Sequence, residues 1–120
     1  MRALLLATIV LGSGCVDDTL SEDTAYRRLV DTWDSEAQCL AEGNLSPCYQ
    51  TLTLCASGRV RMDLAARPQD GEYTLAEGSI AIARFIDMRV EFDLDAQNST
   101  QLPGRHPWQQ VDTIVYDCQP

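Results

Sequence analysis

The sequence predicts an all-β fold, a small antiparallel meander closing to a barrel or half-barrel, preceded by an N-terminal helix. From Tyr49 onward, short segments alternate apolar and polar residues, as "RVRMDLA" (59–65) does. Such alternation is typical of strands with one buried face. Turn residues such as "ASG" (56–58) and "EG" (77–78) separate the segments at regular spacing. Short strands joined by tight turns indicate an antiparallel meander.

The segment before Tyr49 admits two interpretations. Its apolar residues recur with a helical period, which favours a helix over about Ser21–Arg28 that can run further. Ser21 can cap this helix, and Gly43 suits its exit. The rival interpretation makes Leu29–Ser35 the first strand of the sheet. Periodicity alone favours the helix.

The later strands predict an interior. We expect "YQTLTLC" (49–55), "RVRMDLA", "EYTLA" (72–76), "SIAIARF" (79–85), "DMRVEFDLD" (87–95) and "WQQVDTIVYDC" (108–118) to supply it. Arg84 would share a face with Ile80 and Ile82, and would need an anionic partner if it is buried; we expect it at the exposed strand end. The candidate interior or ligand-facing residues are Trp33, Leu52, Leu54, Val60, Met62, Tyr73, Ile82, Arg84, Val90, Phe92 and Trp108.

The N-terminus has the layout of an export signal. Arg2 supplies a positive charge, "ALLLATIVL" (3–11) is an unbroken apolar run, and small residues lead to Cys15. The run is shorter than the roughly 20 residues that span a bilayer. This stretch resembles bacterial lipoprotein signals, although Gly12 stands where that family usually has Leu. The resemblance implies that residues 1–14 are removed and that Cys15 is acylated, with palmitate among its lipids.

A tether follows the cysteine. The acidic, polar "VDDTLSEDT" (16–24) predicts a solvated tether over residues 15–25 and a single domain over residues 26–120. By the same resemblance, Val16 rather than Asp after the cysteine favours the outer membrane over the inner one. We therefore expect a lipid-anchored protein of the bacterial cell envelope, with the anchor as its contact with the membrane.

Charge excludes one class of partner. The formal net charge is −9 for the whole chain, and removing residues 1–14, with Arg2 as their one charge, leaves −10. All basic residues except the single His are Arg. Such a chain is repelled by nucleic acid, so nucleic acid is not expected as a partner.

Without Cys15, four cysteines remain. An even number in an exported domain of this size predicts two disulfides, for which three connectivities exist. Proximity favours Cys39–Cys48, closing "LAEGNLSP" (40–47), and Cys55–Cys118, tying the last strand to the body. A metal site is not expected, because the chain lacks a C-x-x-C pair and has only His106 as an imidazole ligand.

Several segments together resemble small bacterial lipocalin-like lipoproteins. They are "LVDTW" (29–33), "YQTLTLCASGRV" (49–60), "GEYTLAEGSIAI" (71–82), "VEFDLD" (90–95) and "LPGRHPWQQV" (102–111). The resemblance covers roughly residues 29–111, and Asp31 replaces the Gly that this pattern expects before Thr32-Trp33. It implies a lipocalin-like barrel that holds a small apolar or amphipathic ligand, or fills its interior with side chains.

The sequence predicts a binding function without catalysis or cofactor. No nucleophile stands beside His106 in the sequence, and "DLD" (93–95) is expected to end a strand with solvated charges. The first hypothesis is a module for a small apolar or amphipathic ligand. The second is an envelope protein–protein interaction module or enzyme inhibitor that presents the loop "NSTQLPGRHPW" (98–108). The third is a structural surface lipoprotein with no ligand.

Overall fold

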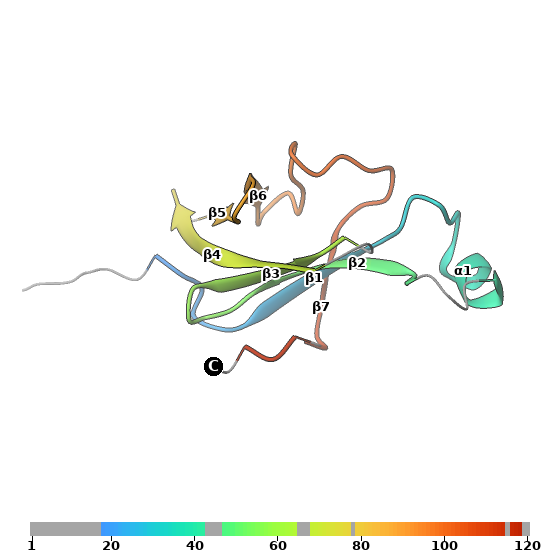
Figure 1. Cartoon of the computed structure of the whole chain (residues 1–120), viewed down its shortest axis with the longest axis horizontal. Helices are drawn as coiled ribbons and strands as arrows, with labels where there is room; N and C mark the ends of the chain where they lie inside the picture. The colour runs from blue at the N-terminus through green and yellow to red at the C-terminus, as the bar shows by residue number, and fades with distance from the viewer. Residues whose placement is uncertain (1–17, 43–46, 65–67, 78, 115, 119–120) are drawn as a thin grey trace, which may run out of the picture.

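The fold is an antiparallel β half-barrel, seen in a computed structural model that describes residues 18–42, 47–64, 68–77, 79–114 and 116–118. Its one sheet has the strand order β6-β5-β4-β3-β2-β1-β7. The elements are β1 (Thr24–Leu29), α1 (Glu36–Glu42), β2 (Tyr49–Leu54), β3 (Arg59–Asp63), β4 (Pro68–Ala76), β5 (Ile80–Arg84), β6 (Arg89–Asp93) and β7 (Gln109–Val111). The all-β meander predicted from the sequence is confirmed, and the described residues add the short helix α1 (Figure 1).

The sheet curls so that strands distant in its order meet across the concave face. Phe92 of β6 lies with its ring centroid 4.8 Å from that of Tyr26 on β1 and 6.0 Å from that of Trp108, the residue before β7. Figure 1 shows β5, β6 and the chain between β6 and β7 above the face formed by β1 to β4. The core therefore lies between the two halves of one curled sheet.

Alternation along each strand decides which residues enter this core. The buried cluster consists of Tyr26, Leu52, Leu54, Val60, Met62, Tyr73, Ala81, Ala83, Val90, Phe92, Leu102 and Trp108. Leu52 faces Met62 and Leu54 faces Val60 in the β2–β3 register, so their side chains share the inner face. These positions match the alternation seen in the sequence.

The phase predicted for β5 is wrong. Tyr73 pairs with Ala83 and Leu75 with Ala81, so the two alanines point inward. Ile82 lies on the outer face and is only half-buried, and Arg84 on the same face is exposed, as expected for Arg84. A shift of one residue exchanges the two faces of a strand. The small alanines fit here because Tyr73, Val90 and Phe92 on the neighbouring strands fill the space around them.

The N-terminal region forms a strand and then a helix, so both predictions for it need correction. Residues 24–28 belong to β1 rather than a helix, and the strand ends at Leu29 instead of starting there. The helix begins later, at Glu36, where Ser35 Oγ accepts a hydrogen bond of 3.1 Å from the Gln38 N–H as an N-cap. β1 is extended because it pairs with β2 on one side and β7 on the other.

The predicted tether is also shorter than expected, because residues 18–25 belong to the domain. The Leu75 N–H donates to the Asp18 carbonyl at 2.6 Å, and Thr19 Oγ1 donates to the Ala56 carbonyl at 3.0 Å. The Leu20 N–H donates to the Tyr73 hydroxyl at 3.0 Å. The chain is thus fastened to the sheet from Asp18 onward.

Both predicted disulfides are confirmed. Cys39–Cys48 ties α1 to the start of β2, and Cys55–Cys118 ties the turn after β2 to the C-terminal segment. This segment crosses the outer face of the sheet, where the Arg59 guanidinium donates to the Tyr116 hydroxyl at 2.6 Å. In Figure 1 it lies on the side of the sheet opposite β5 and β6.

Candidate functional site

The chain between β6 and β7 lies over the concave face and covers both free edges of the sheet. Gln101 Oε1 accepts a hydrogen bond of 2.9 Å from the Glu91 N–H of β6. Gln97 Oε1 accepts one of 3.2 Å from the Gln110 N–H of β7. Unpaired strand edges are templates for association with other chains. These two side chains satisfy edge donors and block one such contact at each edge.

This connection starts with a turn that Asp93 organises. Asp93 Oδ1 accepts hydrogen bonds from the N–H groups of Asp95 at 2.9 Å and Ala96 at 3.0 Å. The turn ends at Gln97, whose φ of 55° places it in the left-handed region. The sequence motif "DLD" (93–95), expected to end a strand, therefore ends β6 and caps the following turn.

Beneath the loop lies a buried cation, Arg28. Its side chain projects inward from β1, and the residue is only 6% exposed. Its guanidinium donates to the carbonyls of Leu102 at 2.7 Å and Pro103 at 3.2 Å, and its Nε donates to Gln50 Oε1 at 2.7 Å. Burial lowers the pKa of Arg28 below its usual value, and the charge of Asp31 acts in the opposite direction. The charge is satisfied by backbone carbonyls and an amide oxygen of the loop and sheet.

The Trp108 ring and the Gly104 backbone pack against the Arg28 guanidinium. Its central carbon lies 4.6 Å from the Trp108 ring centroid, a cation–π contact. On another side Gly104 approaches so closely that a Cβ there would lie 2.7 Å from Nη1. Leu102, Gly104 and Trp108 are therefore positioned by one side chain of β1.

A second set of contacts fixes the far half of the loop. The Arg105 guanidinium lies within 3.0 Å of the carbonyls of Asp31 and Trp33 and of Asp34 Oδ1. The Arg105 N–H also donates to Asp31 Oδ1 at 3.1 Å. His106 Nε2 lies 2.7 Å from the Trp33 carbonyl, which can only accept, so Nε2 carries the hydrogen of this contact. These contacts join the loop to the turn between β1 and α1.

One side of the loop packs against the sheet, and the other side is exposed to solvent. Ser99, Leu102 and Trp108 are buried, whereas the exposed residues are Thr100, Gln101, Pro103, Gly104, Arg105 and Pro107. We call Thr100–Pro107 the presented loop. A shallow hollow of about 430 Å³ lies along it and reaches Arg28 and Trp108. A surface segment fixed from beneath binds with a smaller loss of conformational freedom than a mobile one.

Most residues predicted as interior pack against one another in the core: Leu52, Leu54, Val60, Met62, Tyr73, Val90, Phe92 and Trp108. Ile82 and Arg84 lie on the other face, as described above. Trp33 is half-buried in the turn after β1, outside that cluster. The indole N–H groups of Trp33 and Trp108 are buried without a hydrogen-bond partner among the described residues.

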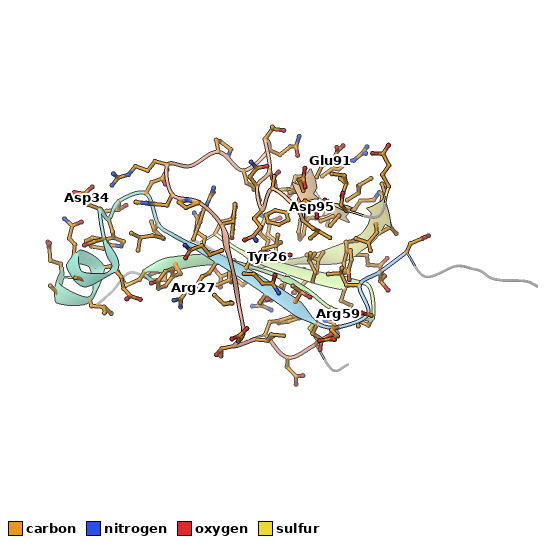
Figure 2. All side chains as sticks on the ribbon, turned by 180° about the vertical axis from the view of Figure 1, so that it is seen from behind. Tyr26, Arg27, Asp34, Arg59, Glu91 and Asp95 are labelled. Atoms are coloured by element: carbon orange, nitrogen blue, oxygen red, sulfur yellow. A yellow bond between two sulfur atoms is a disulfide. The ribbon has the colours of Figure 1, made fainter. Side chains whose placement is uncertain are left out.

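The outer face holds a second hollow, of about 590 Å³, that sequence reasoning did not anticipate. It lies between β1, β2 and the chain after β7, with Arg27, Tyr49, Thr51 and Asp112 in its lining. Arg27 lies 4.0 Å above the Tyr49 ring. Figure 2 shows Arg27 and Arg59 on this face and Tyr26 and Asp95 on the other. The adjacent arginines 27 and 28 thus point to opposite faces of β1.

Within the described ranges, Asp23, Cys55 and Cys118 are the group whose ligand atoms lie close enough for a metal ion. Both thiols are joined to each other in a disulfide, so they cannot act as thiolate ligands. Asp23 Oδ1 accepts a hydrogen bond of 2.8 Å from the Ala56 N–H. This cluster is a structural tie between the N-terminal segment, the β2–β3 turn and the C-terminus.

The fold and the loop together define a disulfide-linked β half-barrel with one firmly held exposed loop. Neither a protein-family model, nor a curated protein, nor a solved structure matches this chain. Among the described residues, no helix has both the length and the apolar character that crossing a bilayer requires.

Proposed function

We propose that this chain is a lipid-anchored envelope protein that binds another protein through its presented loop, without catalysis. The observation that supports this most is the fastening of the loop by Arg28. Two carbonyl groups of an exposed segment are fixed by one buried guanidinium, which is costly to bury. A rigid exposed loop on a stable scaffold is a common arrangement for binding.

The packing of the core favours a surface site over an interior one. The predicted ligand-facing residues Leu52, Met62 and Phe92 are 0–1% exposed and belong to one packed cluster. An apolar ligand inside the half-barrel would have to displace these side chains. The hypothesis of a small apolar or amphipathic ligand therefore has less support than a protein partner.

The charges around the presented loop indicate the chemistry of the partner. The neighbouring turn and α1 carry Asp31, Asp34, Glu36 and Glu42, and all four are exposed. Arg105, the one cation of the loop, is already 2.7 Å from Asp34 Oδ1. Acidic surfaces attract basic partners at long range and raise their association rate. We infer a partner with a basic surface, whose association rate falls as salt is added.

The absence of catalysis is part of the proposal. His106 uses Nε2 to hold the Trp33 carbonyl, and Ser99 Oγ lies 3.2 Å from Gln101 Oε1. Through these contacts both side chains stabilise the conformation of the loop. An enzyme inhibitor is one form that such a module can take.

Attachment to the membrane through Cys15 is the remaining part of the proposal and rests on the lipoprotein-like signal in residues 1–15. Cys15 lies outside the described residues. Palmitate labelling of the expressed full chain is expected to be lost in Cys15→Ser. Retained labelling would overturn the anchor but leave the proposed binding loop untouched.

The binding proposal is tested by comparing two matched variants on envelope proteins of the source cell. Thr100→Arg changes an exposed residue of the presented loop, and Thr113→Arg makes the same change at an exposed residue lining the outer hollow. We expect a partner captured by the unmodified protein to bind Thr100→Arg roughly tenfold more weakly, a loss of about 1.4 kcal/mol. It should bind Thr113→Arg normally.

Two results would contradict the proposal. Equal binding of the partner by Thr100→Arg and the unmodified protein would place the contact elsewhere. A small apolar molecule that co-purifies with the protein, seen by native mass spectrometry and lost on Phe92→Ala, would support the interior site instead.

A further inference from the structure

Ile86 is an exposed apolar residue at the turn between β5 and β6. It is 94% exposed, and among the described residues the other large apolar side chain that is exposed is Leu40 of α1, at 70%. The turn is closed by a hydrogen bond of 2.8 Å from the Phe85 N–H to the Met88 carbonyl. Phe85 and Met88 pack against the core, so Ile86 is held outward between two anchored residues.

Ile86 lies near the point where the N-terminal chain leaves the domain. Thr19 and Ile86 line one surface hollow, together with Ser57 and Gly58 of the β2–β3 turn. The chain is fastened to the sheet from Asp18, as described above, and Cys15 precedes Asp18 by three residues. Three residues span at most about 10 Å. A lipid on Cys15 would therefore hold this part of the domain close to the bilayer surface.

The lining of this hollow carries no net formal charge. Its charged lining residues are Arg59, Arg84, Asp70 and Glu72, whose formal charges cancel. Beside it, Arg84 and Arg89 face each other in the β5–β6 register, one on each side of Ile86 along the chain. Exposed acids also lie at this end, because Asp87 follows Ile86 and Asp18 begins the described chain. Arginines and acids are therefore mixed around Ile86.

We propose that Ile86 inserts into the bilayer that holds the lipid on Cys15, so that the domain sits on the membrane in one orientation. This inference rests on the lipid anchor of the proposed function. The two attachments, acyl chains and Ile86, fix the domain at two points instead of one. The described chain begins at one end of the molecule, and α1, with Leu40, lies at the other (Figure 1). The orientation therefore directs α1 away from the membrane.

The test separates insertion from lipid processing in the cell. Protein comprising residues 15–120, with both disulfides intact, keeps Cys15 as its remaining thiol and retains every described residue. This thiol is coupled to a maleimide lipid in phosphatidylcholine vesicles. Ile86→Trp and the matched control Leu40→Trp place a fluorophore at the two exposed apolar positions. Emission of the parent protein, from Trp33 and Trp108, is subtracted.

Lipids brominated in their acyl chains quench only indole rings that enter the bilayer. We expect the emission added by Ile86→Trp to fall at least twofold in brominated vesicles, and that of Leu40→Trp to stay unchanged. Equal quenching of both, or of neither, would overturn the inference.

Hydrogen exchange adds a test that needs no new fluorophore. Coupling the unmodified protein to vesicles should slow hydrogen exchange at residues 85–88. Ile86→Ser should abolish this slowing, whereas Leu40→Ser should not. No slowing in the unmodified protein would contradict insertion.

Failure of insertion and failure of the anchor remain distinguishable. Chemical coupling attaches the protein to the vesicle whatever the cell does with Cys15. Absent quenching would therefore contradict the role of Ile86 alone. Palmitate labelling that persists in Cys15→Ser would contradict the anchor alone.

Discussion

The Arg28 guanidinium lies 4.6 Å from the centre of the Trp108 ring, which joins β1 to the residue before β7 through a buried cation–π contact. The same guanidinium donates to the carbonyls of Leu102 and Pro103. One side chain thus connects β1, the residue before β7 and the loop between β6 and β7. We expect the stability of the loop to depend on this connection.

Replacement of Arg28 by Met keeps an unbranched apolar stem but is shorter and removes the charge and the donors. Hydrogen bonds from charged groups stabilise by roughly 1.5–3 kcal/mol each, and removing a buried charge offsets part of that loss. We expect Arg28→Met to lower the free energy of unfolding by about 2 kcal/mol. Urea denaturation of the oxidised protein measures this. Arg84→Met, at an exposed position, should stay within about 0.5 kcal/mol of the parent. Equal stability of the two variants would contradict the role of Arg28.

Gly104 and Arg28 should be energetically coupled. A Cβ at Gly104 would lie 2.7 Å from Arg28 Nη1, so Gly104→Ala must displace a guanidinium that three acceptors hold. We expect a loss of about 1 to 2 kcal/mol in the parent. The loss should be smaller in the Arg28→Met background, and a double-mutant cycle measures the difference. Additive losses would show that the two residues do not constrain each other.

The two disulfides should differ in their effect on stability. Cys55–Cys118 closes a sequence separation of 63 residues, and Cys39–Cys48 closes one of 9. Loop-closure entropy predicts losses of about 4 and about 2.5 kcal/mol on replacing each pair with Ser. Denaturation of the two double variants gives the comparison. A larger loss from removing Cys39–Cys48 would contradict this ordering.

Stability should fall in alkaline solution because of buried tyrosines. Burial raises the pKa values of Tyr73 and Tyr26 above 10.0. The hydrogen bond from the Leu20 N–H partly offsets this for Tyr73, and the charges of Asp23 and Asp95 make smaller contributions that raise the two pKa values. Unfolded tyrosine ionises first, so this stability is fully present below pH 10 and is lost as pH rises through the higher folded pKa values. Denaturation at several pH values should show the decrease. Tyr73→Phe should reduce the slope, and an unchanged slope would contradict the assignment to Tyr73.

The strands from β2 onward could be predicted because alternation and turn residues are local signals. The N-terminal strand could not, since its apolar residues continue with a helical period into the turn and α1. Pairing of β1 with both β2 and β7 decides its extended form, and β7 lies far away in the sequence. In β5 the isoleucines suggested that Ile80 and Ile82 face inward. Ala81 and Ala83 face inward instead, because the inner positions opposite Leu75 and Tyr73 need small residues.

The candidate site was only partly visible in the sequence. The segment "NSTQLPGRHPW" was predicted to be presented, but the residues that hold it were not. One signal was available: two adjacent arginines in a strand must point to opposite faces, so one of Arg27 and Arg28 has to point inward. Using that signal requires β1 to be identified first. The contacts of Arg105 with the turn at residues 31–34 depend on the folded chain and have no local signature.

Hydrogen exchange at the presented loop tests most directly whether Arg28 holds it rigid. The Leu102 N–H donates to the Ser99 carbonyl and the Arg105 N–H to Asp31 Oδ1, whereas the Tyr73 N–H donates within the sheet region to the Gly58 carbonyl. In Arg28→Met, exchange at Leu102 and Arg105 should accelerate by roughly tenfold or more relative to Tyr73. In Arg84→Met the ratio should match the parent. An unchanged ratio in Arg28→Met would contradict the account.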